Sequence, residues 1–104
     1  MAAFIANLGY PATANHFSHY DALLVPLAVD AGLGELSRMG YLITKEFGPR
    51  VRLAAVTTDL PLVPDKPVDI GVRDFCSICK KCAVCCPSGS IPLGDPTEVN
   101  GTLR

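Results

Sequence analysis

An excess of charge of either sign is missing from this 104-residue sequence. Its nine lysine and arginine residues are nearly balanced by ten aspartate and glutamate residues, which leaves a formal net charge of −1 at pH 7. Proteins that hold nucleic acid need a positive surface field that attracts phosphate groups. We therefore expect no nucleic-acid partner for this chain.

A hydrophobic run long enough to cross a membrane is also missing. The apolar run from Ala22 to Val29 lies between Asp21 and Asp30 and is far shorter than a bilayer span. Residues 1–20 carry no carboxylate, lysine or arginine, but their asparagines, histidines and proline make them too polar for a span. The N-terminus has no basic stretch ahead of an apolar core, so it does not resemble a secretory signal peptide.

Cysteine is absent outside one short segment. All five cysteines lie between positions 76 and 86. A disulfide framework would spread its cysteines along the chain to link distant segments, whereas a metal site needs several thiolates close to one centre. The clustering therefore favours a metal site. Because thiolate sites of this kind are assembled under reducing conditions, we expect assembly in the cytoplasm.

The spacing of these cysteines indicates which kind of metal site to expect. Four of them follow the pattern C-x2-C-x2-C-x3-C with a proline after the last, as in bacterial ferredoxins: Cys76, Cys79, Cys82, Cys86 and Pro87. We predict that these four cysteines are ligands of [4Fe–4S] clusters. A zinc ribbon would need two separated pairs, and a thioredoxin-type redox site needs only two cysteines. Cys85 lies off the pattern and is predicted to be an inert thiol.

The fourth cysteine of such a run has a separate role. In two-cluster bacterial modules it lies on a short helix and binds the other cluster. The first cluster would then receive only three ligands from this chain. No cysteine follows Cys86, so the remaining ligands require a second cysteine motif. The sequence therefore predicts the first half of a two-cluster module, in a chain truncated at its C-terminus.

The other residues predict a mixture of short helices and strands. Ser18 and Asp21 have the spacing of a capping box ahead of a helix whose interior Pro26 would strain. Prolines 61, 64 and 67 mark an extended linker. In chain order we expect a helix over 1–8, a loop over 10–15, a helix over 22–31, and strands over 41–44 and 51–57 joined as a β-hairpin. The predicted fold class is α/β (α+β), with domains at 1–66 and 67–104.

Much of the chain resembles the catalytic subunits of respiratory reductive dehalogenases. The segment from Phe75 to Pro87 is similar to the first ferredoxin motif of that family. The other matching stretches are residues 8–12, 25–29, 30–44, 46–53 and 56–61. The resemblance covers nearly the whole chain.

This resemblance implies a fold, a reaction and partners. The implied fold is the C-terminal part of a nitroreductase-like core that holds a cobalamin-type corrinoid, followed by the first half of a ferredoxin-like module with two [4Fe–4S] clusters. The implied reaction removes halide from an organohalide, with electrons that pass through the clusters to the corrinoid cobalt. The implied partners are an electron donor of the respiratory chain and a small membrane-anchor protein. The implied location is the periphery of the cell membrane, after export of the full-length protein.

Several parts of the family pattern have no counterpart in this sequence. It has no twin-arginine export signal and no second cysteine motif. The tyrosine proton donor of the family lies upstream of the matching segment, so that role is not assigned to Tyr10. We therefore expect a fragment that does not dehalogenate on its own.

The resemblance also implies a role for Arg38. It lies in the part of the chain that resembles the active-site region, where a cation would stabilise the anion of the proton donor or bind the corrinoid. Arg38 is therefore the candidate catalytic residue, and the alternative is an ordinary surface arginine. Glu35 and Asp59 are candidate partners for its charge.

Four residues are candidates for corrinoid binding. Gly32 and Gly34 would let the backbone approach a cofactor closely, although a simple helix cap would explain Gly32 equally well. Asn15 and His16, together with His19, would line the corrinoid pocket. The alternative for this polar group is a solvated loop.

Two other functions stay open at this point. Epoxyqueuosine reductases share the corrinoid core and the cysteine run, but a Gly-Trp-Ile-Gly-Lys type of segment would favour them, and here the sequence from Gly34 to Arg38 differs. A plain ferredoxin-type electron carrier would show two cysteine runs in a short chain and no α/β segment before them. This sequence has the opposite arrangement.

Overall fold

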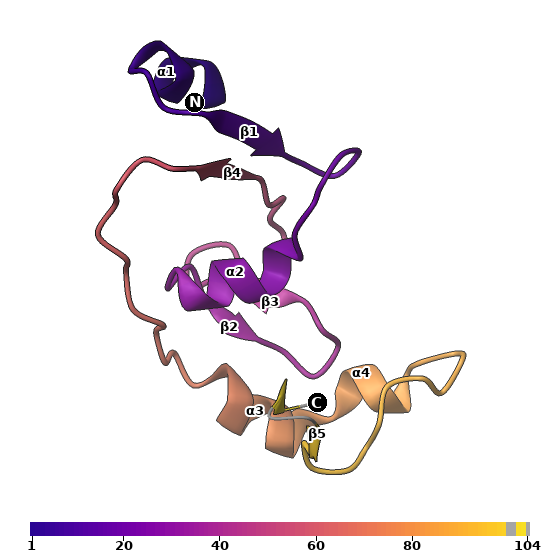
Figure 1. The fold of residues 1–104 in the computed structure, drawn as a ribbon. Coiled ribbons are helices and arrows are strands. Elements are labelled where there is room, and N and C mark those ends of the chain that lie inside the picture. The colour runs from indigo at the N-terminus through magenta and orange to yellow at the C-terminus, as the bar shows by residue number, and fades with distance from the viewer. Residues whose placement is uncertain (100–101, 104) are drawn as a thin grey trace.

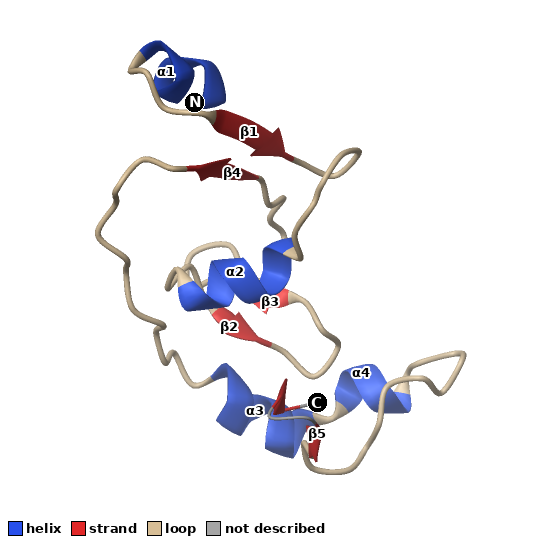
Figure 2. Cartoon of the chain, viewed as in Figure 1, coloured by secondary structure: helices blue, strands red, loops and turns tan. Residues whose placement is uncertain are grey.

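The computed structural model describes residues 1–99 and 102–103. Figure 1 shows helices and short strands strung along an open chain, and Figure 2 distinguishes the two kinds of element. The elements in chain order are α1 (Ala2–Asn7), β1 (Ala12–Asn15), α2 (Leu24–Asp30), β2 (Glu35–Leu36), β3 (Leu42–Ile43), β4 (Ala55–Thr58), α3 (Val72–Cys79), α4 (Lys81–Val84), β5 (Glu98–Val99) and β6 (Thr102–Leu103). The mixture of helices and strands confirms the predicted class at this coarse level.

Strands β1 and β4 form a two-stranded antiparallel ribbon in which Ala12 lies opposite Thr58 and Asn15 lies opposite Ala55. The expectation of a loop over residues 10–15 is therefore wrong. The sequence Ala-Thr-Ala-Asn is short and carries none of the large aromatic residues that favour strands. Its extended conformation depends on a partner about forty residues away, which a local pattern does not reveal.

Strands β2 and β3 form a separate hairpin, in which Glu35 pairs with Ile43 and Leu36 with Leu42. The Ser37 amide donates to the carbonyl of Tyr41 and closes the turn. The predicted hairpin between residues 41–44 and 51–57 is therefore wrong. The Gly48-Pro49 turn, which suggested it, closes locally in a bridge between Thr44 and Gly48.

Helix α2 begins at Leu24, so Pro26 lies in its first turn. The amide groups of a first turn have no partner inside the helix, and a proline there leaves no hydrogen bond broken. The expected strain at Pro26 is therefore absent. The capping box is also wrong, because the N-cap residue is Leu23 and no side chain caps the helix.

The cysteine segment consists of α3 and α4 joined at one residue. Lys80 between them has a φ of 48°, in the left-handed region that lets the chain turn sharply. Cys86 lies in the turn beyond α4, so the expectation that the fourth cysteine sits on a short helix is wrong. The cysteine that α4 carries is Cys82 instead.

Few apolar side chains in the described residues are buried, and they are spread over separate elements: Ile5, Ala28, Leu42 and Ala83. The radius of gyration is 16.2 Å, whereas a compact domain of this length would have roughly 13 Å. Figure 1 shows this open arrangement, in which the arm between β4 and α3 runs along the outside of the molecule with no regular structure. In the described part of the chain, no helix has the length and apolar character that a membrane crossing requires.

Candidate metal centre

Three of the four predicted cluster ligands line one cavity. It has a volume of about 410 Å³, and Cys76, Cys79 and Cys82 are all part of its wall. Cys86 is not among the residues that line it. This division matches the predicted sharing of ligands, in which three cysteines serve one cluster and the fourth serves another. Ligation itself stays a prediction.

Apolar side chains form much of the remaining wall of this cysteine cavity. They come from the β2–β3 hairpin and from the start of α3: Met39, Ile43, Ile70, Val72 and Phe75. The hydrophobic surroundings of an iron–sulfur cluster influence its access to water and its reduction potential. The hairpin therefore forms part of the cysteine cavity, although it lies in the other predicted domain.

The cysteines of the chain are free thiols, without disulfide bonds. Within residues 1–99 and 102–103, no three Cys, His, Asp or Glu side chains converge closely enough to hold a single metal ion. A cubane cluster makes a different demand, because each thiolate binds a separate iron at its own corner. Four thiols at the ferredoxin spacing, three of them on one cavity, are a donor set that fits an iron–sulfur cluster.

Cys86 lies beside two serine hydroxyl groups. Its Sγ is 3.3 Å from Oγ of Ser88 and 3.6 Å from Oγ of Ser90. Hydrogen bonds from Ser88 first and then Ser90 lower the pKa of the Cys86 thiol from 9.0 to about 6. The thiolate is the form that binds metal, and a pKa of about 6 means that Cys86 is mostly in this form at neutral pH. Cys85, its neighbour, is exposed.

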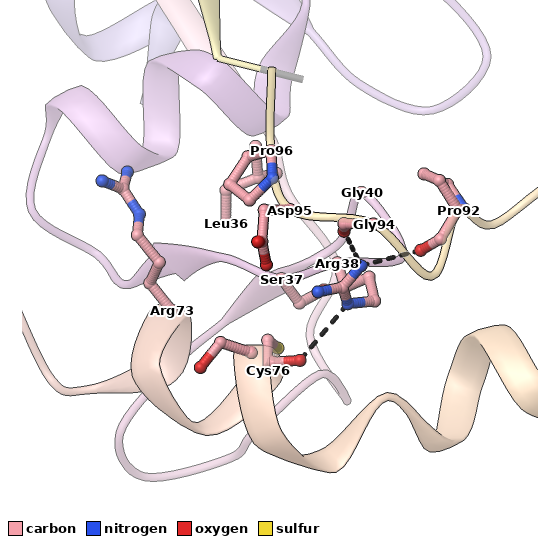
Figure 3. A pocket seen from close by; sticks show the side chains of 11 residues that line it. Leu36, Ser37, Arg38, Gly40, Arg73, Cys76, Pro92, Gly94, Asp95 and Pro96 are labelled. Atoms are coloured by element: carbon pink, nitrogen blue, oxygen red, sulfur yellow. Dashed lines mark hydrogen bonds between the residues drawn. The ribbon is translucent and has the colours of Figure 1, made fainter. Parts of the chain in front are cut away.

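Arg38 extends from the turn of the β2–β3 hairpin toward the cysteine segment. Figure 3 shows its side chain in a second cavity, of about 300 Å³, with three backbone carbonyl groups around the guanidinium. Nε donates to Cys76 at 3.2 Å, and Nη1 donates to Pro92 at 2.7 Å and to Gly94 at 2.6 Å. Arg38 therefore connects the hairpin to α3 and to the loop that follows Cys86. Its proposed part in catalysis stays a prediction.

Glu35 does not pair with Arg38, contrary to expectation. Its Oε2 accepts hydrogen bonds from the amide groups of Ile70 at 2.6 Å and Val72 at 3.0 Å. These amides stand at the start of α3. Glu35 and Arg38 thus both contact the cysteine helix, at different points along it.

The two glycines predicted to approach a corrinoid lie against the chain's own backbone. A Cβ atom at Gly34 would collide with the carbonyl group of Ile43 on the paired strand, and a Cβ atom at Gly32 would collide with the carbonyl oxygen of Lys66. Gly32 also has a φ of +69°, as expected for the residue that ends α2. Chain packing therefore explains both glycines, and corrinoid contact at either one stays a prediction.

Asn15 and His16 have different surroundings. Asn15 is 1% exposed, and its Oδ1 accepts a hydrogen bond from the Asp21 amide at 2.9 Å while Nδ2 donates to Thr57 Oγ1 at 3.4 Å. His16 is exposed, and its Nδ1 lies 3.0 Å from Ser18 Oγ. Asn15 thus fastens the β1–β4 ribbon to the following loop. Contact of either residue with a corrinoid stays a prediction.

Sequence reasoning missed the residues that support the cysteines. Ser88 and Ser90 follow Cys86 closely enough for local spacing to have suggested hydrogen bonds to its thiol. Glu35 was named only as a candidate charge partner of Arg38, and its hydrogen bonds to the start of α3 were not expected. Its contacts cross 35 positions to Ile70 and 37 to Val72, and no local pattern predicts such distances.

Comparison with known proteins supports the sequence resemblance. The tetrachloroethene reductive dehalogenase of Dehalobacter restrictus is 54% identical over 91 residues, which are 88% of this chain and 16% of that protein. The tetrachloroethene reductive dehalogenase of Sulfurospirillum multivorans is 62% identical over 73 residues, 70% of this chain and 15% of that protein. The epoxyqueuosine reductase of Lactococcus garvieae is less similar, with 38% identity over 71 residues. No protein-family model matches the sequence.

The solved structures that resemble this chain are also reductive dehalogenases. One reductive dehalogenase structure superposes on this chain with a TM-score of 0.88 at 41% identity, over 99% of this chain and 15% of that one. That structure is described as suggesting a mechanism for B12-dependent dehalogenation. A catabolic reductive dehalogenase in complex with 3-bromo-4-hydroxybenzoic acid superposes with a TM-score of 0.87 at 40% identity, over 98% of this chain and 15% of that one. The chain thus spans about one sixth of the length of the relatives that it matches. It belongs with the reductive dehalogenases, and it corresponds to one segment of them.

Proposed function

We propose that this chain supplies part of the iron–sulfur site of a reductive dehalogenase that removes halide from an organohalide. The observation that carries the proposal is the cavity lined by Cys76, Cys79 and Cys82, in a chain that is 54% identical to a tetrachloroethene reductive dehalogenase. We propose the finer architecture as well: residues 1–66 are the end of a nitroreductase-like core, and residues 67–104 begin a ferredoxin-like module.

The cysteines are the residues through which this chain would bind iron–sulfur clusters. Cys76, Cys79 and Cys82 would bind one [4Fe–4S] cluster, and Cys86 would bind another. When bound, the clusters supply electrons, and a corrinoid supplies the cobalt centre at which a carbon–halogen bond is cleaved. The residues around the cysteine cavity have a supporting task, which is to exclude water and to fix the thiols relative to one another.

We also propose partners and a location for the full-length protein, from the relationship of this chain to the reductive dehalogenases. The full protein would take electrons from a donor of the respiratory chain, act on an organohalide, and lie at the periphery of the cell membrane beside a small anchor protein after export. Support for these proposals comes from the family alone. They can be tested in a bacterium that respires organohalides, by fractionation and by co-purification.

A chimaera with a whole relative tests the function. This chain would replace the 91 matching residues of the Dehalobacter restrictus enzyme, and chloride release from tetrachloroethene would be measured with a strong reductant. We expect the chimaera to release chloride and to lose that activity when Cys79→Ser is introduced. A chimaera that folds and binds iron and corrinoid, yet releases no chloride, would contradict the proposal.

A further inference from the structure

Helix α3 carries Cys76 and Cys79, and its own sequence supports its first turn only in part, through Asp69 and the acidic Asp74. Gly71 is the N-cap residue, with a φ of +82°, and no side chain provides the usual cap hydrogen bond. The first amides of a helix have no partner within the helix and need an acceptor from elsewhere. For α3 one acceptor is local, because Asp69 Oδ1 accepts from the amide of the N-cap residue Gly71 at 3.0 Å. The acceptor for the first helical amide, that of Val72, comes from a distant part of the chain.

This distant acceptor is the carboxylate of Glu35 on β2. One oxygen, Oε2, accepts from the amides of Ile70 and Val72, on either side of the N-cap residue. Glu35 is half-buried, so water competes less effectively for these hydrogen bonds. Its negative charge also stands at the end of α3 where the helix dipole is positive.

Arg38 makes the opposite contact in the C-terminal half of the helix. Cys76 is among the last four residues of α3, whose carbonyl groups lack partners in a following turn. The Nε of Arg38 donates to the Cys76 carbonyl, which places a positive charge near the end of the helix where the dipole is negative. Both side chains come from the β2–β3 hairpin and its turn, so a single element contacts α3 at its start and in its C-terminal half.

We propose that Glu35 is a positioning residue for the iron–sulfur site: together with Arg38 it forms a clamp, matched in charge to the dipole of α3, that fixes the helix bearing Cys76 and Cys79. This inference rests on the proposed function only in naming a cluster as the occupant of the cysteine cavity. The clamp sets the positions of two thiols relative to Cys82, which lies on α4 beyond the sharp turn at Lys80. Without Glu35, α3 frays at its start, and the thiols no longer hold one arrangement.

Amide hydrogen exchange of the metal-free chain tests the clamp without any cofactor. In Glu35→Ala, exchange at Ile70 and Val72 should become faster by on the order of tenfold to a hundredfold, as expected for loss of hydrogen bonds to a charged acceptor. Glu35→Gln keeps an acceptor oxygen and should lose much less protection. Glu46→Gln, at an exposed glutamate of the same chain, is the matched control and should change neither amide. Equal exchange at both amides in Glu35→Ala and the parent would overturn the clamp.

Iron loading tests the link from the clamp to the cluster. The parent and variants would be reconstituted anaerobically with iron and sulfide, and iron per chain and the electron paramagnetic resonance spectrum of the reduced state would be recorded. We expect Glu35→Ala to lose iron several-fold faster to a chelator and to give a broader spectrum, with Glu35→Gln close to the parent. If Glu35→Ala matched the parent in both readouts, the positioning role would be overturned.

A cysteine variant separates failure of this inference from failure of the proposed function. If Cys79→Ser abolishes iron binding while Glu35→Ala leaves it unchanged, the cluster is present and only the positioning role is wrong. If Cys79→Ser leaves iron binding unchanged, the proposed cluster site itself is wrong, whatever the Glu35 variants do. Circular dichroism of every variant checks that its helices are retained.

Discussion

Cys86 shows how two neighbouring hydroxyl groups change the chemistry of a thiol. Ser88 and Ser90 lower its pKa from 9.0 to about 6, because their hydrogen bonds stabilise the negative sulfur. Since the folded pKa is depressed, the thiolate form adds stability that is complete above pH 9.0 and is lost as the pH falls toward about 6. Binding of metal at Cys86 should follow the same direction, because protons compete with metal for the sulfur.

Alkylation of Cys86 tests this pH dependence. In the metal-free chain with the other cysteines replaced by serine, the rate of reaction with iodoacetamide should rise with pH around a midpoint of about 6. Ser88→Ala should move the midpoint toward 9.0, since Ser88 makes the largest contribution. Ser77→Ala is a suitable control, because the Ser77 hydroxyl donates to the carbonyl of Asp74 instead. A parent midpoint near 9.0 would show that the serines do not act on this thiol.

Two cysteines near one another should differ sharply in their effect on the cluster. Cys79→Ser should abolish cluster binding, because Cys79 lines the cysteine cavity together with two other predicted ligands. Cys85→Ser should leave iron content nearly unchanged, since Cys85 lies off the ferredoxin pattern and outside that cavity. Iron and sulfide per chain after anaerobic reconstitution measure both effects. Equal losses in the two variants would mean that the assignment of ligands is shifted.

At the scale of elements, local patterns predicted the first two helices, but they predicted neither α3 nor the pairing of the strands. The helices near residues 1–8 and 22–31 were expected and are present as α1 and α2, because the apolar residues lie within each helix and the terminal glycine follows it closely. The predicted strand partners were wrong. Strand β1 pairs with β4, which lies about forty residues later in the chain, and β3 pairs with β2, which precedes it. The cysteine run could be recognised from spacing alone. The contacts of Glu35 could not, since they depend on tertiary structure.

Gly34 is the position at which the β2–β3 hairpin should be most sensitive to substitution. Gly34→Ala should lower the free energy of unfolding by roughly 1–3 kcal/mol, because the new Cβ would collide with the backbone carbonyl of Ile43. Gly94→Ala is the matched control: nothing lies within 4 Å of the position its Cβ would take, and its effect should stay within about 0.5 kcal/mol. Urea unfolding followed by circular dichroism measures both. A Gly34→Ala variant as stable as the control would mean that the strands are less closely paired than described.

At the scale of the whole molecule, large apolar side chains lie on the surface. All four phenylalanines are exposed, with exposed fractions of 65–79%: Phe4, Phe17, Phe47 and Phe75. The same conformation recurs within reductive dehalogenase structures that are several times longer than this chain. We infer that in a full-length enzyme other segments would cover these side chains, which is why the described residues hold so small a core.

This inference predicts a difference between the chain alone and the chimaera. The chain alone should bind a hydrophobic fluorescent dye strongly and should release no halide from tetrachloroethene with added corrinoid and reductant. The chimaera with the Dehalobacter restrictus enzyme should bind little dye and should release chloride. Dye fluorescence and chloride release would be compared at equal protein concentration. Turnover by residues 1–104 alone would refute the expectation that the isolated chain is inactive.

The most direct measurement of the central proposal is the Mössbauer spectrum of the chain after anaerobic reconstitution with isotopically enriched iron and sulfide. We predict the spectrum of a thiolate-bound [4Fe–4S] cluster in the parent chain and its absence in Cys79→Ser. The chain would also be offered zinc in competition, and iron–sulfur assembly should prevail. Tight stoichiometric zinc binding, with no iron–sulfur spectrum under any of these conditions, would contradict an iron–sulfur site in this protein.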